Sequence, residues 1–335
     1  MDKINGLDLG GHTIAVIIPA YKCADQITEA ITTIPGWVSH IVVVDDCSPD
    51  DLSDRVRVID GARVHLIRHK LNMGVGGAFI TGCHKAVELG ADILVKMDGD
   101  GQMDPAQIHK LIKPLTEGKA DYAKGNRFWD LKELRAMPGI RVFGNMILSF
   151  LLKMASGYWN LFDPTNGYIA LTSYMFNNIN LDKVDRRYFF ESSMLIQAGI
   201  QRFVVEDVPM PANYGTETSS LSILRSIFTF PPRLAYGVFR RFLWHYILFD
   251  FTAVSVFVLI GLPALLWGII FGACVWIQNA MINHATPTGT IMLSVLPVII
   301  GIQLISQAIV IDIGNTPKRV LTPSEKTDTS NENDQ

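Results

Sequence analysis

Two long runs without a charged side chain, both near the C-terminal end, constrain the fold of this chain more than any other feature. They cover residues 251–277 and residues 288–311. A helix needs roughly 20 residues to cross the hydrocarbon core of a bilayer, and each run exceeds that length. A pair of core helices in a soluble protein is the alternative, but such helices rarely stay uncharged for so long. The runs therefore predict a two-helix transmembrane hairpin.

Basic residues flank the two runs and are absent from the segment between them. Arg225, Arg233, Arg240 and Arg241 precede the first run, Lys318 and Arg319 follow the second, and residues 276–289 contain neither Lys nor Arg. We expect a multi-pass protein of the cell (inner) membrane. Because cytoplasmic loops carry an excess of Lys and Arg, its N-terminal region and both termini would be cytoplasmic. The first residues, MDKINGLDLGGHT, lack the apolar stretch of a signal peptide, so none is predicted.

Charge and cysteine usage narrow the class of protein further. The net charge of −3 gives no support for a nucleic-acid partner. The cysteines, Cys23, Cys47, Cys83 and Cys274, have neither metal-ligand nor disulfide spacing, which is consistent with a reducing cytosol.

The region before the runs alternates between apolar strands and helical patterns. Strands are predicted at 13–21, 40–47, 64–69, 92–98 and 121–126, and helices at about 24–33, 73–90 and 105–117. Near-continuous apolar strands that alternate with helices predict an α/β fold with a mostly parallel sheet covered on both faces. Such sheets bind ligands at the C-terminal ends of their strands. Polar residues gather at those ends: Pro19-Ala20-Tyr21, Asp45-Asp46, Asn72-Met73-Gly74, Asp98-Gly99-Asp100 and Asn126-Arg127.

The acidic turn Asp98-Gly99-Asp100, a D-x-D motif, follows one of these strands, and Gln102 comes two residues later. Two carboxylates one residue apart can bind one Mg²⁺ or Mn²⁺, cations that prefer oxygen ligands and are often completed by substrate phosphates. A solvated acidic turn has the same local sequence. Asp104 with Pro105 is better explained as the cap and first turn of the next helix.

Three further strand ends offer groups for a nucleotide. Asp45 and Asp46 could accept hydrogen bonds from a ribose hydroxyl or a base edge, and Tyr21 could stack on a base. The stretch NMGVGGA at 72–78 opens a helix, but its glycines do not have the G-x-G-x-x-G spacing of a dinucleotide-binding loop. Its glycines instead predict a close approach of helix to backbone, or of backbone to ligand.

Six blocks together resemble glycosyltransferase family 2. They are PAY at 19–21, VVVDDCSPD at 42–50, NMGVGGA at 72–78, DGDGQMDP at 98–105, GNRF at 125–128 and DPTNGY at 163–168. Their order and spacing resemble the polyprenyl-phosphate branch, which includes dolichol-phosphate mannose synthases and undecaprenyl-phosphate glucosyltransferases. The resemblance covers roughly residues 13–220. It implies a GT-A (Rossmann-like) catalytic domain and an inverting, metal-dependent transfer from a UDP- or GDP-sugar to a polyprenyl phosphate.

The resemblance also implies roles for individual residues. Asp98, Asp100 and Gln102 would hold Mg²⁺ or Mn²⁺ against the donor diphosphate. The nucleotide-sugar would lie against Pro19, Tyr21, Asp45, Asp46, Gly76, Asp98 and Gly99. Arg127 would face the donor or acceptor phosphate, Arg141 the acceptor phosphate, and Asp163 the reacting centre. Dolichol-phosphate mannose synthases usually carry a basic residue where this chain has residues 214–222, which contain none. Arg186, Arg187 or Arg202 could substitute, and Glu191 is a further candidate.

The expected organisation has four parts: a cytoplasmic catalytic domain at 1–220, interfacial helices at 221–246, the transmembrane hairpin at 247–313 and a disordered polar tail at 314–335. A helix predicted at 141–154 could also lie at the membrane interface or pack on the core. Partners would be the nucleotide-sugar, the polyprenyl phosphate and the bilayer, with self-association through the hairpin left open. Two other functions are alternatives. One is a processive polysaccharide synthase of the same superfamily, but such enzymes resemble one another in carrying Gln-x-x-Arg-Trp, which does not occur here. An inactive membrane scaffold would not need the acidic turn.

Overall fold

The computed structural model describes residues 3–4, 7–59, 61–126, 139–161, 166–211 and 223–323, with the backbone alone at 3–4, 7–8, 139–145 and 223–228. The chain divides into two compact units, one of Met1–Val238 with Pro317–Gln335 and one of Phe239–Thr316.

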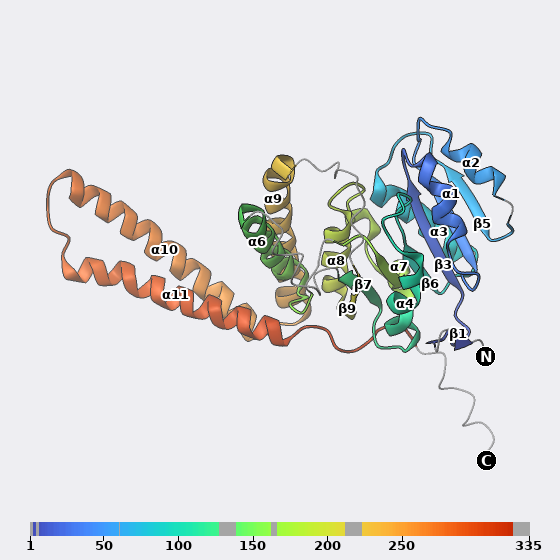
Figure 1. Cartoon of the computed structure of the whole chain (residues 1–335). Helices are drawn as coiled ribbons and strands as arrows, with labels where there is room; N and C mark the ends of the chain where they lie inside the picture. The colour runs from blue at the N-terminus through green and yellow to red at the C-terminus, as the bar shows by residue number, and fades with distance from the viewer. Residues whose placement is uncertain are drawn as a thin grey trace, which may run out of the picture. The chain divides into compact units, whose positions relative to one another are not determined.

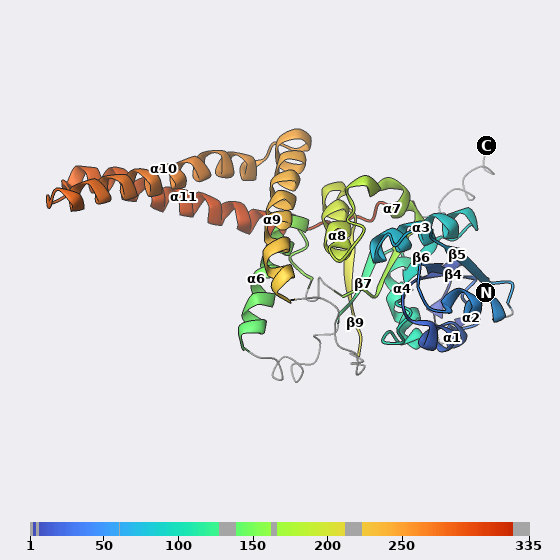
Figure 2. The same cartoon turned by 90° about the horizontal axis from the view of Figure 1, so that it is seen from above.

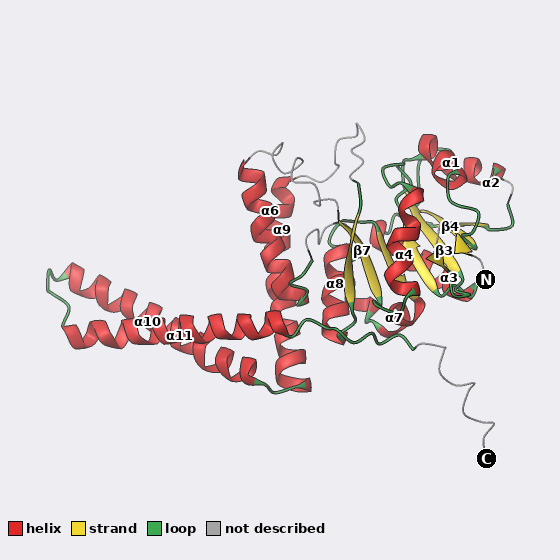
Figure 3. Ribbon diagram, turned by 60° about the horizontal axis from the view of Figure 1, so that its bottom comes forward, coloured by secondary structure: helices red, strands yellow, loops and turns green. Residues whose placement is uncertain are grey.

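The first unit is built on a seven-stranded sheet with the order β5-β4-β3-β6-β8-β7-β9, drawn in yellow in Figure 3. Its strands are β3 (Ile14–Ala20), β4 (His40–Asp45), β5 (Val64–Arg68), β6 (Ile93–Lys96), β7 (Tyr122–Asn126), β8 (Ile169–Thr172) and β9 (Val205–Pro209). Among these strands, β8 runs antiparallel to β6 and β7, and the remaining pairs are parallel. The predicted mostly parallel sheet is therefore confirmed. A separate two-stranded sheet joins β1 (Lys3–Ile4) to β2 (Leu7–Asp8).

Helices cover both faces of this sheet (Figure 1). The core on one face takes in α1 (Ala24–Thr32), α2 (Leu52–Val58) and α4 (Ile108–Thr116). The core on the other takes in α3 (Val75–Glu88), α6 (Gly139–Ser156), α7 (Ser173–Asn178) and α8 (Phe190–Gln201). Successive side chains of a strand point to opposite faces, so Val16 of β3 lies in the first core and Ile17 in the second. Burial on both faces explains why the strands are continuously apolar.

Most element boundaries lie close to their predicted positions, and one predicted helix is divided. The segment expected as a single helix at 105–117 begins as the short 3₁₀ helix η1 (Pro105–Gln107) and continues as α4. The Asp104 carboxylate accepts a hydrogen bond from the backbone N–H of Ala106 at 2.9 Å, which confirms its predicted role as a cap. A second 3₁₀ turn, η2 (Leu181–Lys183), precedes α8.

The stretch expected to hold interfacial helices contains α9 (Ile223–Arg241), followed directly by the π-helical segment η3 (Phe242–Phe249). Within the first unit, α9 packs closely on α6 and α8. A Cβ placed at Gly237 would lie 3.3 Å from the Ala155 side chain and 2.9 Å from that of Ile196.

The second unit contains the helical pair α10 (Ala253–Met281) and α11 (Thr288–Gly314), side by side in Figure 2. Both are long and apolar enough to cross a membrane, with mean hydropathies of 2.5 and 2.1 in their most apolar windows. Only 22% and 11% of those windows is buried, unlike the core helices of a soluble protein. A Cβ at Gly301 would lie 2.7 Å from the carbonyl oxygen of Gly261, so small residues let the two backbones approach closely.

The segment after α11 returns to the first unit. The fully buried Asp121 carboxylate, next to the start of β7, accepts hydrogen bonds from the backbone N–H groups of Leu321 and Thr322 at 3.2 and 2.8 Å. It also accepts one from the Val204 N–H at 2.9 Å. Within the predicted polar tail at 314–335, Leu321 and Thr322 therefore have defined partners.

Candidate active site

The C-terminal ends of β3, β4 and β6 lie side by side, because the three strands are adjacent and parallel. Ala20 pairs with Asp45, and Ile17 pairs with Lys96. The acidic turn after β6 therefore lies beside the end of β3 and the start of α1. A Cβ at Gly99 would lie 3.0 Å from the Cys23 sulfur and 3.2 Å from Ile27. The turn fits against α1 because its middle residue is glycine.

The predicted metal ligands remain accessible. The Asp98 side chain is 33% exposed, Asp100 is partly exposed and Gln102 is exposed. The backbone N–H of Gln102 donates to Asp100 Oδ1 at 3.1 Å, which holds the turn closed. Gly101 has φ +77°, in the left-handed region that glycine adopts without strain.

This donor set fits a hard divalent cation that arrives with a diphosphate. Within the described residues, no cluster of three or more His, Cys, Asp or Glu side chains could hold a metal by itself. Mg²⁺ usually takes one or two carboxylates from the protein and completes its shell with water and substrate phosphates. Two carboxylates and an amide oxygen in an accessible turn can supply such ligands.

Lys96, the last residue of β6, is a feature that the sequence reasoning missed. Its side chain is 1% exposed, and its Nζ lies 2.6 Å from Asp98 Oδ1 and 3.8 Å from Glu191 Oε1. Burial by itself lowers the pKa of the Lys96 ammonium, but the charges of Asp98 and Glu191 raise it above its ordinary value. The signal was present: a lysine in a strand with no other polar residue needs an anionic partner.

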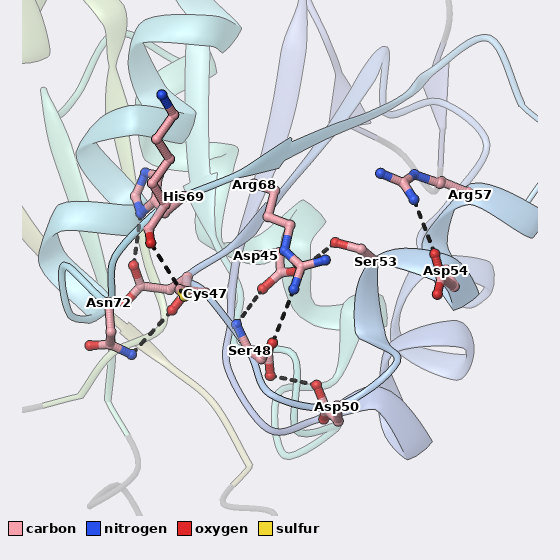
Figure 4. Close-up of polar contacts among 12 residues, drawn as sticks. Asp45, Cys47, Ser48, Asp50, Ser53, Asp54, Arg57, Arg68, His69 and Asn72 are labelled. Carbon is pink, nitrogen blue, oxygen red and sulfur yellow. Dashed lines mark hydrogen bonds and ion pairs between the residues drawn. The ribbon is translucent and has the colours of Figure 1, made fainter.

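Asp45 and Asp46, predicted to contact the nucleotide, both have partners within the protein. Figure 4 shows those of Asp45. Asp45 is fully buried and accepts hydrogen bonds from the Ser48 N–H at 2.7 Å and from the Ser53 hydroxyl. Arg68 lies 3.4 Å from the same carboxylate. These contacts fix the turn between β4 and α2.

Asp46 anchors the glycine-rich segment instead. It is 2% exposed, and it accepts hydrogen bonds from the backbone N–H groups of Met73 at 2.8 Å and Gly74 at 2.7 Å. Its Oδ1 also lies 2.7 Å from Nδ1 of His69. The structure thus joins the end of β4 to the start of α3.

The glycine-rich segment packs against backbone, as predicted. The N–H groups of Gly76 and Gly77 donate to the Arg186 carbonyl at 3.0 and 3.1 Å. A Cβ at Gly76 would lie 2.5 Å from the Asp185 carbonyl oxygen, and one at Gly74 2.5 Å from that of Arg186. The close approach is therefore between α3 and the segment before α8.

The remaining predicted residues have varied positions. Tyr21 is 47% exposed, with the Lys22 ammonium 5.5 Å from its ring centre, and Pro19 lies within β3. Arg186 and Arg187 are exposed beside the glycine-rich segment, whereas Arg202 caps α8 in a left-handed conformation. Arg141 lies in α6, but its side chain is not described, and Arg127 and Asp163 lie outside the described residues.

Comparison with known proteins places these features in a family. Residues 15–179 match the model of glycosyl transferase family 2. The chain is 32% identical over 216 residues to the UDP-N-acetylglucosamine–dolichyl-phosphate N-acetylglucosaminyltransferase of Methanococcus voltae, covering 60% of this chain and 86% of the relative. It is also 32% identical over 205 residues to the polyprenol monophosphomannose synthase of Mycolicibacterium smegmatis, covering 58% and 75%.

Solved structures agree on the fold. Glucosyl-3-phosphoglycerate synthase from Mycobacterium tuberculosis, in complex with phosphoglyceric acid, superposes with a TM-score of 0.53 at 19% identity, covering 71% of this chain and 85% of that one. The same enzyme with Mn²⁺, UDP-glucose and phosphoglyceric acid gives 0.52 at 18% identity, with the same coverage. At such identities the likeness shows the GT-A fold alone.

Proposed function

The chain belongs to glycosyltransferase family 2, in its polyprenyl-phosphate branch, and on that premise we propose that it transfers a sugar from a nucleotide-sugar to the phosphate of a polyprenyl lipid at a membrane. One observation carries the proposal. Asp98, Asp100 and Gln102, all at least partly exposed, belong to one turn at the strand ends where parallel sheets bind ligands.

The two reactants are both anions, so the protein must supply positive charge to bring them together. A lipid monophosphate is largely dianionic near neutral pH, because its second pKa is about 6. An oxygen of that phosphate bonds to the anomeric carbon as the bond from this carbon to the diphosphate oxygen breaks. The diphosphate leaves with the electron pair, and the anomeric configuration inverts. No strong general base is needed.

The residues of the chain have distinct roles in this proposal. Asp98, Asp100 and Gln102 hold Mg²⁺ or Mn²⁺, which when bound would neutralise the charge developing on the departing diphosphate. Tyr21 is exposed and free to stack on the base. By the family resemblance, Arg127 and Arg141 would orient the phosphates and Asp163 would act near the reacting centre; the structure does not describe these three side chains.

An acceptor with a lipid tail explains the apolar surfaces. Met146, Ile147 and Phe150 of α6 are 63%, 46% and 48% exposed, and Tyr236 of α9 is 61% exposed. We propose that these helices lie at the membrane interface and that α10 and α11 span the bilayer, with the catalytic domain in the cytoplasm. The phosphate of a polyprenyl lipid lies at headgroup level, where such helices would meet it.

A donor screen tests the proposed function. The purified full-length protein, in detergent with Mg²⁺ or Mn²⁺, would be incubated with a short polyprenyl phosphate and radiolabelled UDP- or GDP-sugars. UDP-N-acetylglucosamine comes first, because the name of the Methanococcus voltae relative includes it. We expect labelled lipid from one donor and its loss on chelation with EDTA. Failure of every common UDP- and GDP-sugar would contradict the proposal.

A further inference from the structure

Lys96 is a buried ammonium in direct contact with the acidic turn, and the transfer step described above does not use it. Its Nζ lies 2.6 Å from Asp98 Oδ1, 3.3 Å from the Gly167 carbonyl oxygen and 3.8 Å from Glu191 Oε1. These partners belong to three segments: the turn after β6, the segment before β8 and the first turn of α8. One side chain thus ties together segments that are far apart in sequence.

Gly167 shows how tightly this cluster is packed. A Cβ at this position would lie 3.0 Å from Lys96 Nζ, 3.4 Å from Asp98 Oδ2 and 3.4 Å from Glu191 Oε1. The first distance is shorter than about nine in ten Cβ contacts in proteins. The charged groups that a methyl group would meet are held by their own ion pairs. The backbone of the segment therefore rests directly on the three charged groups.

The charges of the cluster determine how Asp98 can act. Glu191 is only 17% exposed, so the two carboxylates need a counter-charge within the protein. Lys96 supplies it and occupies Oδ1 of Asp98. The other oxygen, Oδ2, lies beside Gly167, and the Asp98 side chain as a whole remains 33% exposed. The charge of Asp100 also acts on the Lys96 ammonium, more weakly than those of Asp98 and Glu191.

We infer that Lys96 is a positioning residue for the metal and donor site: it holds Asp98 through Oδ1 and so fixes how this carboxylate meets the cation. The inference rests on the proposed function. It also means that the protein places a fixed positive charge beside a site for a divalent cation. That charge weakens cation binding while it fixes the geometry.

Substitution of this lysine separates the two effects. Lys96→Met keeps most of the side-chain volume and removes the charge. We expect the purified full-length variant to bind Mn²⁺ alone on the order of tenfold more tightly, because a repelling charge is gone. The transfer rate should fall on the order of 100-fold, because Asp98 loses its orientation. Electron paramagnetic resonance of free Mn²⁺ measures the first effect without donor or acceptor. A merely structural role would weaken both properties.

Three further variants keep the test decisive if Lys96→Met folds poorly. The double variant Lys96→Met/Glu191→Gln removes one charge of each sign, so its Mn²⁺ affinity should return to within about threefold of wild type. Gly167→Ala leaves every charge in place, so it should slow transfer without tightening Mn²⁺. Lys124→Met is the matched control. It removes another fully buried ammonium, which donates to the Asn166 carbonyl, and should lower stability without tightening Mn²⁺.

The outcomes distinguish this inference from the proposed function. Unchanged Mn²⁺ affinity in Lys96→Met, or a Mn²⁺ affinity of the double variant that differs from wild type by more than about threefold, would overturn the role of Lys96 alone. Equal tightening in Lys124→Met would overturn it too, since the effect would then be general. A wild-type protein that binds no Mn²⁺ would overturn the metal site itself, and the inference with it.

Discussion

Asp45 and Asp46 at the end of β4, and Asp98 and Asp100 after β6, are acidic pairs at the same edge of one sheet. The first pair is 0% and 2% exposed, and both carboxylates accept hydrogen bonds from backbone N–H groups of neighbouring segments. In the second pair, the Asp98 side chain is 33% exposed, and only one of its oxygens is held by Lys96. An acid whose oxygens are satisfied within the protein fixes a loop, whereas one that stays partly exposed is accessible to a ligand.

The largest effect, on transfer activity, should come from the partly exposed pair, Asp98 and Asp100. Asp100→Asn removes a carboxylate that we propose as a cation ligand, while its amide can still accept the hydrogen bond from the Gln102 N–H. We expect transfer activity to fall at least about 100-fold, because the developing charge on the diphosphate is no longer neutralised. The unfolding temperature should hardly change. Radiolabel transfer and thermal unfolding measure the two properties.

The control for this variant lies in the same turn. Asp104→Asn keeps a residue that caps helices as well as Asp, so its activity should stay within about twofold of wild type. Substantial activity in Asp100→Asn, or equal losses in both variants, would remove the distinction between a metal ligand and a structural acid.

An intermediate effect, on stability, is expected from the buried pair, Asp45 and Asp46. Asp46→Asn turns an amide NH₂ toward groups that already donate, the N–H of Met73 or of Gly74. We expect the free energy of unfolding to fall by about 2–3 kcal/mol, since a buried donor is left without an acceptor. Chemical denaturation of the full-length protein measures this, and Mn²⁺ affinity should not change.

Asp54→Asn is the matched control on the neighbouring helix α2. Asp54 is 76% exposed and pairs with Arg57 at 3.0 Å. Exposed ion pairs contribute little to the free energy of unfolding, so this variant should be nearly as stable as wild type. If Asp46→Asn left stability intact and instead weakened nucleotide binding, the nucleotide-contact role predicted from the sequence would replace the anchoring role.

The smallest effect concerns two thiols, one beside each acidic pair. Burial, with the charges of Asp50, Asp100 and Asp98, raises the pKa of Cys23 to about 12, so at pH 8 its thiolate fraction is on the order of 10⁻⁴. Cys47, next to Asp46, is only partly buried. We expect iodoacetamide at pH 8 to modify Cys47 well before Cys23, as peptide mass spectrometry would show. Faster modification of Cys23 would mean that the contact between α1 and Gly99 opens readily.

Sequence patterns located most of the fold and part of the site. Continuous apolar strands gave the parallel sheet, and the uncharged runs gave α10 and α11, because burial and membrane insertion act on composition that can be read along the chain. From the sequence patterns, Asp46 and Asp98 were both predicted to contact the nucleotide-sugar. Their difference depends on which N–H groups and cations the folded chain brings to each carboxylate, and those partners come from residues 73–74 and from Lys96.

The sequence by itself determined the class of protein: a sheet whose strand ends carry acids and glycines, and two helices suited to a bilayer. The tertiary structure decided which acids are buried with partners inside the protein and which stay partly exposed. It also showed that Lys96, Gly167 and Glu191, separated by up to 95 residues, form one charged cluster. The physical reason is that a buried charge is tolerated only with a partner, and that partner is chosen by packing rather than by distance along the chain.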